Sequence, residues 1–121
     1  QNEIKLLSLA VTDHPLRIFE YKIDYAKLVP SYKLMTYNGK TATIVGWRIA
    51  SRRLRTRNEQ YMQFLTLEDR YGLMEAVMFP DVFKRYGGQL VGAGPFLARG
   101  TVQSRLPGEA NFIISYLESL A

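Results

Sequence analysis

Four arginines, Arg52, Arg53, Arg55 and Arg57, lie within six residues of this sequence. A planar guanidinium group can bind two oxygens of one phosphate, and a cluster that displaces counterions binds a polyphosphate in a salt-dependent way. The charge is local: residues 26–58 contain eight Lys or Arg and no Asp or Glu, and the remaining residues contain eight basic and eleven acidic ones. The cluster therefore predicts a polyanionic partner, and a solvated surface of skewed composition is the alternative.

Catalytic chemistry has no comparable support. Two-metal phosphoryl transfer needs converging carboxylates, but Glu68 and Asp69 are adjacent at the end of an expected strand, so their side chains diverge. His14 has no nucleophile motif beside it, and a single histidine without cysteine excludes the common zinc sites. No glycine-rich phosphate loop is present. We therefore expect no catalytic residue, no metal site and no cofactor.

The elements that must position the arginines are mostly β-strands. Alternating apolar patterns, β-branched residues and turn signals mark five strands. They are expected at residues 41–54, 60–69, 73–80, 94–105 and 110–118. A short helix follows the third strand, with Asp81 as its expected cap and Gly87-Gly88 at its end, and Gly46 marks a bend or bulge in the long first strand. This order predicts a mainly β fold, a five-stranded OB-fold Greek-key barrel with one helix between the third and fourth strands.

The chain divides into two expected parts. Residues 1–38 are predicted to be a helical N-terminal segment and linker, in which Thr12 or Asp13 caps a short helix, and residues 39–121 to be the OB-fold domain. The Asn38-Gly39 pair favours a turn before the first strand. Because no apolar run is long enough to cross a bilayer and the N-terminus carries no leader pattern, we expect a soluble, cytoplasmic protein without a membrane partner.

Strand alternation also predicts which side chains face the barrel interior. The interior set is expected to be Leu65, Leu67, Met74, Ala76 and Met78, and the outer set Phe64, Glu75, Val77 and Phe79. Trp47 is expected in the core. Phe64 and Tyr61 are candidates for stacking on bases, with the alternative that Phe64 only covers the barrel. Arg52 and Arg53 are neighbours on a strand, so they point to opposite faces unless a bulge intervenes.

Several local motifs resemble one family. The arginine pair Arg52-Arg53, the following "RTR", "FLTLED", "EAVMFP" and the upstream "DHPL" resemble the OB domain of the bacterial DNA polymerase III alpha subunit, over about residues 7–117. The resemblance implies a module of a replicative polymerase. Two features depart from the pattern: "RNEQY" replaces the usual glycine-bearing tip of the first loop, and no polymerase catalytic domain is present. Nucleotidyl transfer therefore cannot belong to these residues, and an excised piece of a larger polymerase is favoured over a free-standing relative.

Composition and resemblance together predict a noncatalytic module that binds single-stranded template DNA during replication, with no small-molecule substrate. OB-folds bind single strands across the second and third strands and between the first and last hairpin loops. The residues expected to bind nucleic acid are Arg48, Arg52, Arg53, Arg55, Arg57, Tyr61, Phe64, Glu75, Phe79 and Arg105. The alternatives are an RNA- or tRNA-binding OB domain and a protein-interaction barrel that docks another replisome subunit.

Overall fold

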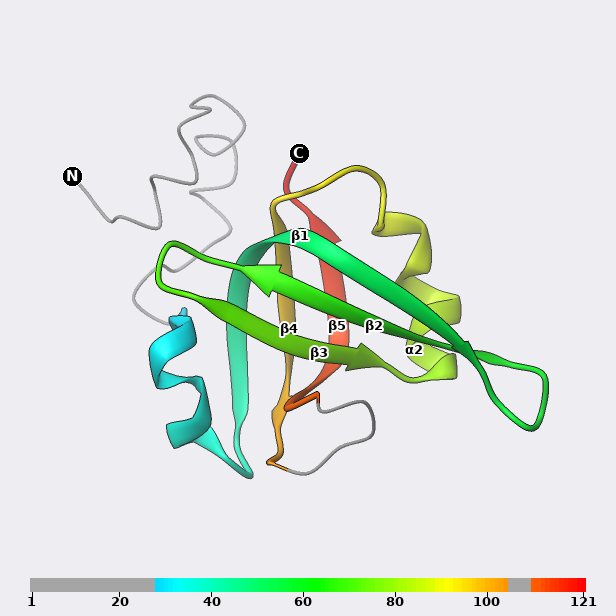
Figure 1. The fold of residues 1–121 in the computed structure, drawn as a ribbon, viewed down its shortest axis with the longest axis horizontal. Coiled ribbons are helices and arrows are strands. Elements are labelled where there is room, and N and C mark those ends of the chain that lie inside the picture. Colours follow the sequence, from blue (N-terminus) through cyan, green and yellow to red (C-terminus); the bar gives the residue numbers. More distant parts are fainter. Residues whose placement is uncertain (1–27, 105–109) are drawn as a thin grey trace.

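The computed structural model describes residues 28–104 and 110–121. Its five strands are β1 (Thr41–Arg55), β2 (Tyr61–Glu68), β3 (Leu73–Met78), β4 (Phe96–Val102) and β5 (Phe112–Ser119). They close into a barrel in the order β1-β2-β3-β5-β4, in which β3 and β5 are parallel and the other neighbours antiparallel (Figure 1). Helix α2 (Pro80–Tyr86) lies between β3 and β4 in the chain. The predicted OB-fold is confirmed.

Strand β1 serves both sides of the barrel because it changes partner at Gly46. Its first part, Thr41–Gly46, pairs with β4, and its second part, Trp47–Arg55, pairs with β2. A Cβ atom on Gly46 would lie 3.1 Å from the carbonyl oxygen of Glu68, so glycine permits the close approach of the two strands. The change of partner falls at the glycine where the sequence predicts a bend or bulge. The bulge lies further along, because the register shift between Arg48 and Ala50 leaves Ile49 unpaired.

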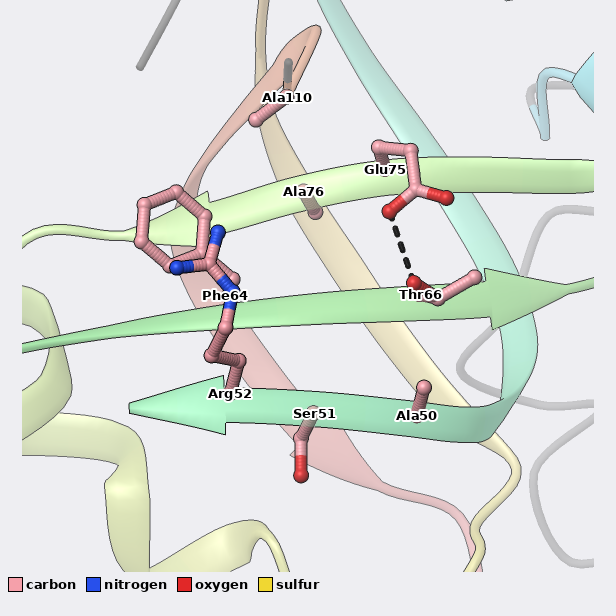
Figure 2. A pocket seen from close by; sticks show the side chains of 8 residues that line it. All are labelled: Ala50, Ser51, Arg52, Phe64, Thr66, Glu75, Ala76 and Ala110. Carbon is pink, nitrogen blue, oxygen red and sulfur yellow. Dashed lines mark hydrogen bonds between the residues drawn. The ribbon is translucent and has the colours of Figure 1, made fainter. Parts of the chain in front are cut away.

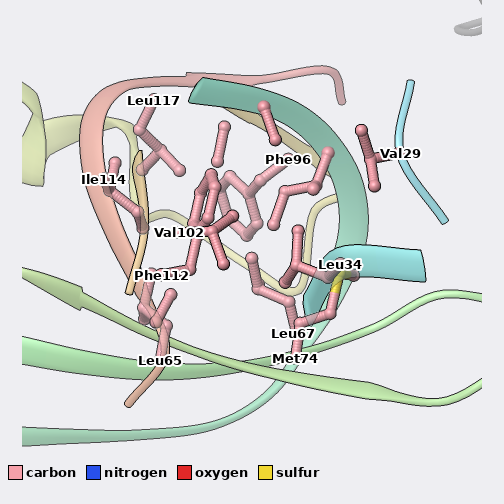
Figure 3. Packing of buried hydrophobic residues seen from close by; sticks show 14 of the residues in the cluster. Val29, Leu34, Leu65, Leu67, Met74, Phe96, Val102, Phe112, Ile114 and Leu117 are labelled. Carbon is pink, nitrogen blue, oxygen red and sulfur yellow. The ribbon is translucent and has the colours of Figure 1, made fainter. Parts of the chain in front are cut away.

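The barrel interior contains the side chains that alternation predicts. Leu65, Leu67, Met74, Ala76 and Met78 all belong to the main core cluster and are at most 1% exposed. Figure 3 shows several of them packed against side chains of the other strands and of the segment before β1. These partners include Phe96, Val102, Phe112, Ile114 and Leu117. The prediction that Trp47 is a core residue is wrong: it is only half-buried, because its position on β1 faces outward.

The segment before β1 packs against the barrel end. A 3₁₀-helix, η3 (Ser31–Tyr37), buries Leu34 in the main core cluster, and Val29 joins the same cluster. The Asn38-Gly39 turn forms as predicted: the Lys40 N–H donates to the Tyr37 carbonyl at 2.7 Å, and Gly39 has a φ of 84°. The division of the chain after residue 38 stays a prediction. The expected helix at Thr12–Pro15 lies outside the described residues.

Helix α2 begins two residues earlier than expected. Phe79 occupies the N-cap position and Pro80 the first helical position, so the prediction of Asp81 as the cap is wrong. Proline suits that position because it lacks the N–H that would have no partner there, and Asp81 instead adds negative charge to the first turn. Past Tyr86 the chain continues into a 3₁₀-helix, η4 (Gly87–Gln89). Within the described ranges no helix is long and apolar enough to span a membrane.

Candidate nucleic-acid interface

A groove of about 260 Å³ crosses the outer face of β1, β2 and β3. Figure 2 shows the side chains that line it, which come from these three strands and from the residue that precedes β5. They are Ala50, Ser51, Arg52, Phe64, Thr66, Glu75, Ala76 and Ala110. The register places Arg52 opposite Phe64 and Thr66 opposite Glu75, so strand pairing alone aligns the polar side chains across the groove.

One end of the groove is cationic. The Arg52 guanidinium carbon lies 4.4 Å from the centroid of the Phe64 ring, so the two groups form a cation–π pair (Figure 2). Phe64 lies on the outer face, as predicted, but only 7% of it is exposed, because Arg52 covers the ring and Met62, Val77 and Ala110 pack around it. A ligand entering here meets the guanidinium plane of Arg52 before it meets the phenyl ring.

The other end of the groove is acidic. The Thr66 hydroxyl donates a hydrogen bond of 2.7 Å to Glu75 Oε1, which fixes the carboxylate within the groove (Figure 2). Phe79, another predicted outer residue, is half-buried and packs against the cluster of Met62, Phe64 and Val77. The groove therefore combines the guanidinium of Arg52, the hydrogen-bonded carboxylate of Glu75 and the hydroxyl groups of Ser51 and Thr66.

The other arginines of the sequence cluster do not line this groove. Arg53 lies on the opposite face of β1, with its guanidinium carbon 5.5 Å from the Tyr61 ring centroid and 5.3 Å from that of Phe83. This divergence from Arg52 is what a regular strand predicts, because the bulge at Ile49 comes before both residues. Tyr61 lies on the Arg53 side and is 43% exposed. Together with Pro80, Phe83 and Lys84 it lines a second hollow of about 300 Å³ beside α2.

The β1–β2 hairpin projects beyond the barrel and carries two more of the arginines (Figure 1). Arg55 forms an ion pair of 3.2 Å with Glu59, and both side chains are more than half exposed, so the pair contributes little to stability. Arg57 is exposed in the loop. Arg48 points elsewhere and donates a hydrogen bond of 2.6 Å to the Gly92 carbonyl. Arg105 lies outside the described residues.

Five groove residues were not among the residues predicted to bind: Ala50, Ser51, Thr66, Ala76 and Ala110. Thr66 carries a usable signal, because alternation puts it on the same face as Phe64 and its polar side chain interrupts an apolar strand. Ala110 carries none, because it reaches the groove only through the parallel pairing of β3 with β5. In the part of the chain that the structure describes, no three His, Cys, Asp or Glu side chains are grouped so that they can hold a metal ion.

An aromatic cluster lies outside the groove, on β4 and β5. The Arg99 guanidinium carbon lies 5.0 Å from the Tyr116 ring centroid, and Tyr86 packs edge-to-face against the same ring. Burial raises the pKa of the Tyr116 hydroxyl, and its hydrogen bond of 3.0 Å to Glu118 raises it further. This cluster joins α2 to the barrel and takes no part in the groove.

Comparison with known proteins finds DNA polymerases similar to this chain. DNA polymerase III subunit alpha from two strains of Staphylococcus aureus, MSSA476 and MW2, is 27% identical over all 121 residues, which span 11% of that protein. An error-prone DNA polymerase of Symbiobacterium thermophilum is 28% identical over 86 residues, 70% of this chain and 8% of the relative. The resemblance to the DNA polymerase III alpha subunit is thus confirmed. The chain covers only a small part of these relatives.

Solved structures and a family model give the same fold. A crystal structure of asparaginyl-tRNA synthetase from Pyrococcus horikoshii superposes with a TM-score of 0.57 at 22% identity, over 76% of this chain and 22% of that one. A likeness at this identity shows the fold alone. A family model described as an OB-fold nucleic acid binding domain matches residues 42–120. The matched range contains all five strands except the first residue of β1, together with every residue of the groove, and the chain belongs to this family of OB-fold nucleic acid binding domains.

Proposed function

We propose that this chain is a noncatalytic module of a replicative DNA polymerase similar to the DNA polymerase III alpha subunit, and that it binds single-stranded template DNA. The observation that carries the proposal is the groove across β1, β2 and β3, with the Arg52 guanidinium stacked at one end. The polymerase relatives and the nucleic-acid-binding family support the kind of ligand. Such a role belongs in the cytoplasm, beside other replisome subunits.

In this proposal the arginines contact different parts of the bound strand. Arg52 offers donors to a phosphate and a flat surface to a base, while Arg55 and Arg57 on the projecting hairpin meet the backbone further along the strand. Nucleotidyl transfer falls to the rest of the polymerase, since no carboxylates converge in the described residues as two-metal chemistry needs. With three arginines on phosphates, the logarithm of affinity should fall with the logarithm of salt concentration at a slope of about −2.

Fluorescence anisotropy of labelled oligothymidine, titrated at several salt concentrations, tests the proposal. Arg52→Ala should weaken binding roughly tenfold, because hydrogen bonds to an ionised partner are lost. The matched control is Arg99→Ala, which removes an equal charge from the Tyr116 cluster and should change affinity much less. Equal losses in both variants, or no binding by the unaltered chain at low salt, would refute the proposed site.

A competition arm addresses the RNA-binding alternative. Unlabelled oligouridine and oligodeoxyuridine of the same length differ only in the 2′-hydroxyl, so they compete equally if the protein binds single strands through phosphates and base faces. Displacement by the RNA at a far lower concentration than by the DNA would assign the groove to RNA.

A further inference from the structure

A buried carboxylate joins two segments that are far apart in the chain. Asp69 is 5% exposed and accepts four hydrogen bonds: from the Ser31 N–H and hydroxyl at 2.7 Å each, from the Tyr71 N–H at 2.8 Å and from the Gly72 N–H at 3.0 Å. The first two donors start η3 and the last two form the turn between β2 and β3. The carboxylate therefore holds the start of η3 against the β2–β3 turn.

This connection places two exposed tyrosines side by side. Tyr32 follows Ser31, and its ring centroid lies 4.9 Å from that of Tyr71 at an interplanar angle of 83°. Tyr32 is 64% exposed and Tyr71 52% exposed, so neither ring is there to fill the core. Edge-to-face packing fixes the two rings relative to each other and leaves aromatic surface facing solvent. We call Tyr32 and Tyr71 the tyrosine pair.

The surroundings of the tyrosine pair are apolar and cationic. Met35 shares a face of η3 with Tyr32, because residues three apart on a 3₁₀-helix eclipse, and it is 45% exposed. Leu73, which follows the turn, is 54% exposed. The Arg70 guanidinium carbon lies 5.6 Å from the Tyr71 ring centroid. An exposed apolar patch of this kind marks an interaction site, and a flanking guanidinium favours an anionic ligand.

The patch continues the groove. Leu73 and Glu75 are two residues apart on β3, so their side chains share the outer face, and the β2–β3 turn lies at the acidic end of the groove. Along β3, Val77, which pairs with Phe64, lies about 13 Å from Leu73 beside the turn, within the reach of the several nucleotides that one OB-fold binds.

Resting on the proposed function, we infer that the tyrosine pair is a second stacking site, which receives a base of the single strand after that strand has left the groove over the β2–β3 turn. An aromatic ring beside a guanidinium matches a base beside its phosphate. The arrangement extends the binding site from the Arg52 end of the groove to the opposite end of the three-stranded surface.

Binding of two ligands by the Tyr71→Ala variant tests the inference. The first ligand is oligothymidine of about 12 nucleotides, and the second is an abasic oligomer of equal length, which keeps the phosphates and lacks the bases. Tyr71→Ala should weaken binding of oligothymidine by roughly fivefold or more and leave binding of the abasic oligomer unchanged, because only a base can stack. Tyr71→Phe keeps the ring and should bind oligothymidine as the unaltered chain does.

Other outcomes overturn the inference in distinguishable ways. If the unaltered chain binds neither ligand, the proposed function fails and the second stacking site fails with it. If the chain binds oligothymidine and Tyr71→Ala binds it equally well, only the stacking site fails, and the patch is then better explained by a protein partner. If Tyr71→Ala weakens both ligands alike, Tyr71 supports the turn and does not stack. Photocrosslinking of an oligomer that carries iododeoxyuridine, followed by mass spectrometry, should label Tyr71 or Tyr32.

Discussion

Glu59, at the tip of the β1–β2 hairpin, adopts a backbone conformation that residues with a Cβ atom rarely adopt. Its φ is 58°, in the left-handed region, where a residue with a Cβ atom pays about 1 kcal/mol relative to glycine. Its N–H donates to the Thr56 carbonyl at 3.0 Å, which completes the turn. The turn thus keeps a backbone geometry that glycine favours, although a glutamate occupies the position.

Glu59→Gly should therefore stabilise the fold by about 0.5–1 kcal/mol and strengthen oligothymidine binding at low salt. The stability gain follows from relief of the left-handed strain, and the affinity gain from release of the Arg55 guanidinium. Thermal unfolding and anisotropy measure the two effects. Glu59→Gln separates them, because it frees Arg55 and retains the strain; a Gln variant as stable as the Gly variant would contradict the backbone explanation.

Residue types predict which side chains can bind, but not where all of them point. Arg52 and Arg53 diverge as strand alternation predicts, so only one of the pair lines the groove. The position of Phe64 on the outer face was predicted. The contact between its ring and the Arg52 guanidinium was not, because a cation–π contact depends on rotamers that alternation does not specify.

At the scale of elements, the contact between β4 and β5 depends on one glycine. Gly100 sits at the register shift beside Arg99, and a Cβ atom built there would overlap the carbonyl oxygen of Ile113. Backbone cannot yield as a flexible side chain does, so the two strands must separate locally to admit even a methyl group.

Gly100→Ala should destabilise the fold by about 1–3 kcal/mol, since it overpacks the contact between two paired strands. Gly88→Ala is the matched control, because nothing lies within 4 Å of a Cβ atom there and its φ is not in the left-handed region. Urea unfolding compares the two variants. Equal stability of the two variants would show that β5 can move away from residue 100 without loss of unfolding free energy.

The bounds of the long first strand were predicted more closely than the start of the helix. The expected strand at residues 41–54 and the observed β1, Thr41–Arg55, differ by one residue, because a long β-branched alternation has no rival interpretation. The start of α2 was misassigned, since Asp81 has the side chain of a cap but Pro80 has the backbone of a first helical residue, and the latter decides.

At the scale of the whole molecule, residues 28–38 behave as part of the barrel. Leu34 is 2% exposed in the main core cluster, and the Val29 N–H donates to the Thr43 carbonyl of β1 at 2.8 Å. Asn38 bridges to Val102 on β4, so this segment contacts both strands that meet at that end of the barrel.

Leu34→Ala should cost about 2–5 kcal/mol of unfolding free energy, because it leaves a cavity in the main core cluster. Met35→Ala on the same 3₁₀-helix changes a side chain that is 45% exposed and should cost under about 0.5 kcal/mol. Denaturant unfolding followed by circular dichroism distinguishes them. Similar small losses in both would mean that the segment unfolds independently of the barrel.

The sequence by itself determined the succession of strands along the chain, the single helix after β3, the interior set on β2 and β3, and the local excess of positive charge. These properties follow from alternation, turn residues and composition, all of which act over a few neighbouring residues. Only the tertiary structure decided that Ala110 reaches the groove and that Asp69 joins Ser31 to the β2–β3 turn. Barrel closure pairs residues as far apart in the chain as Thr41 and Thr101, and no local pattern encodes the contacts that such closure creates.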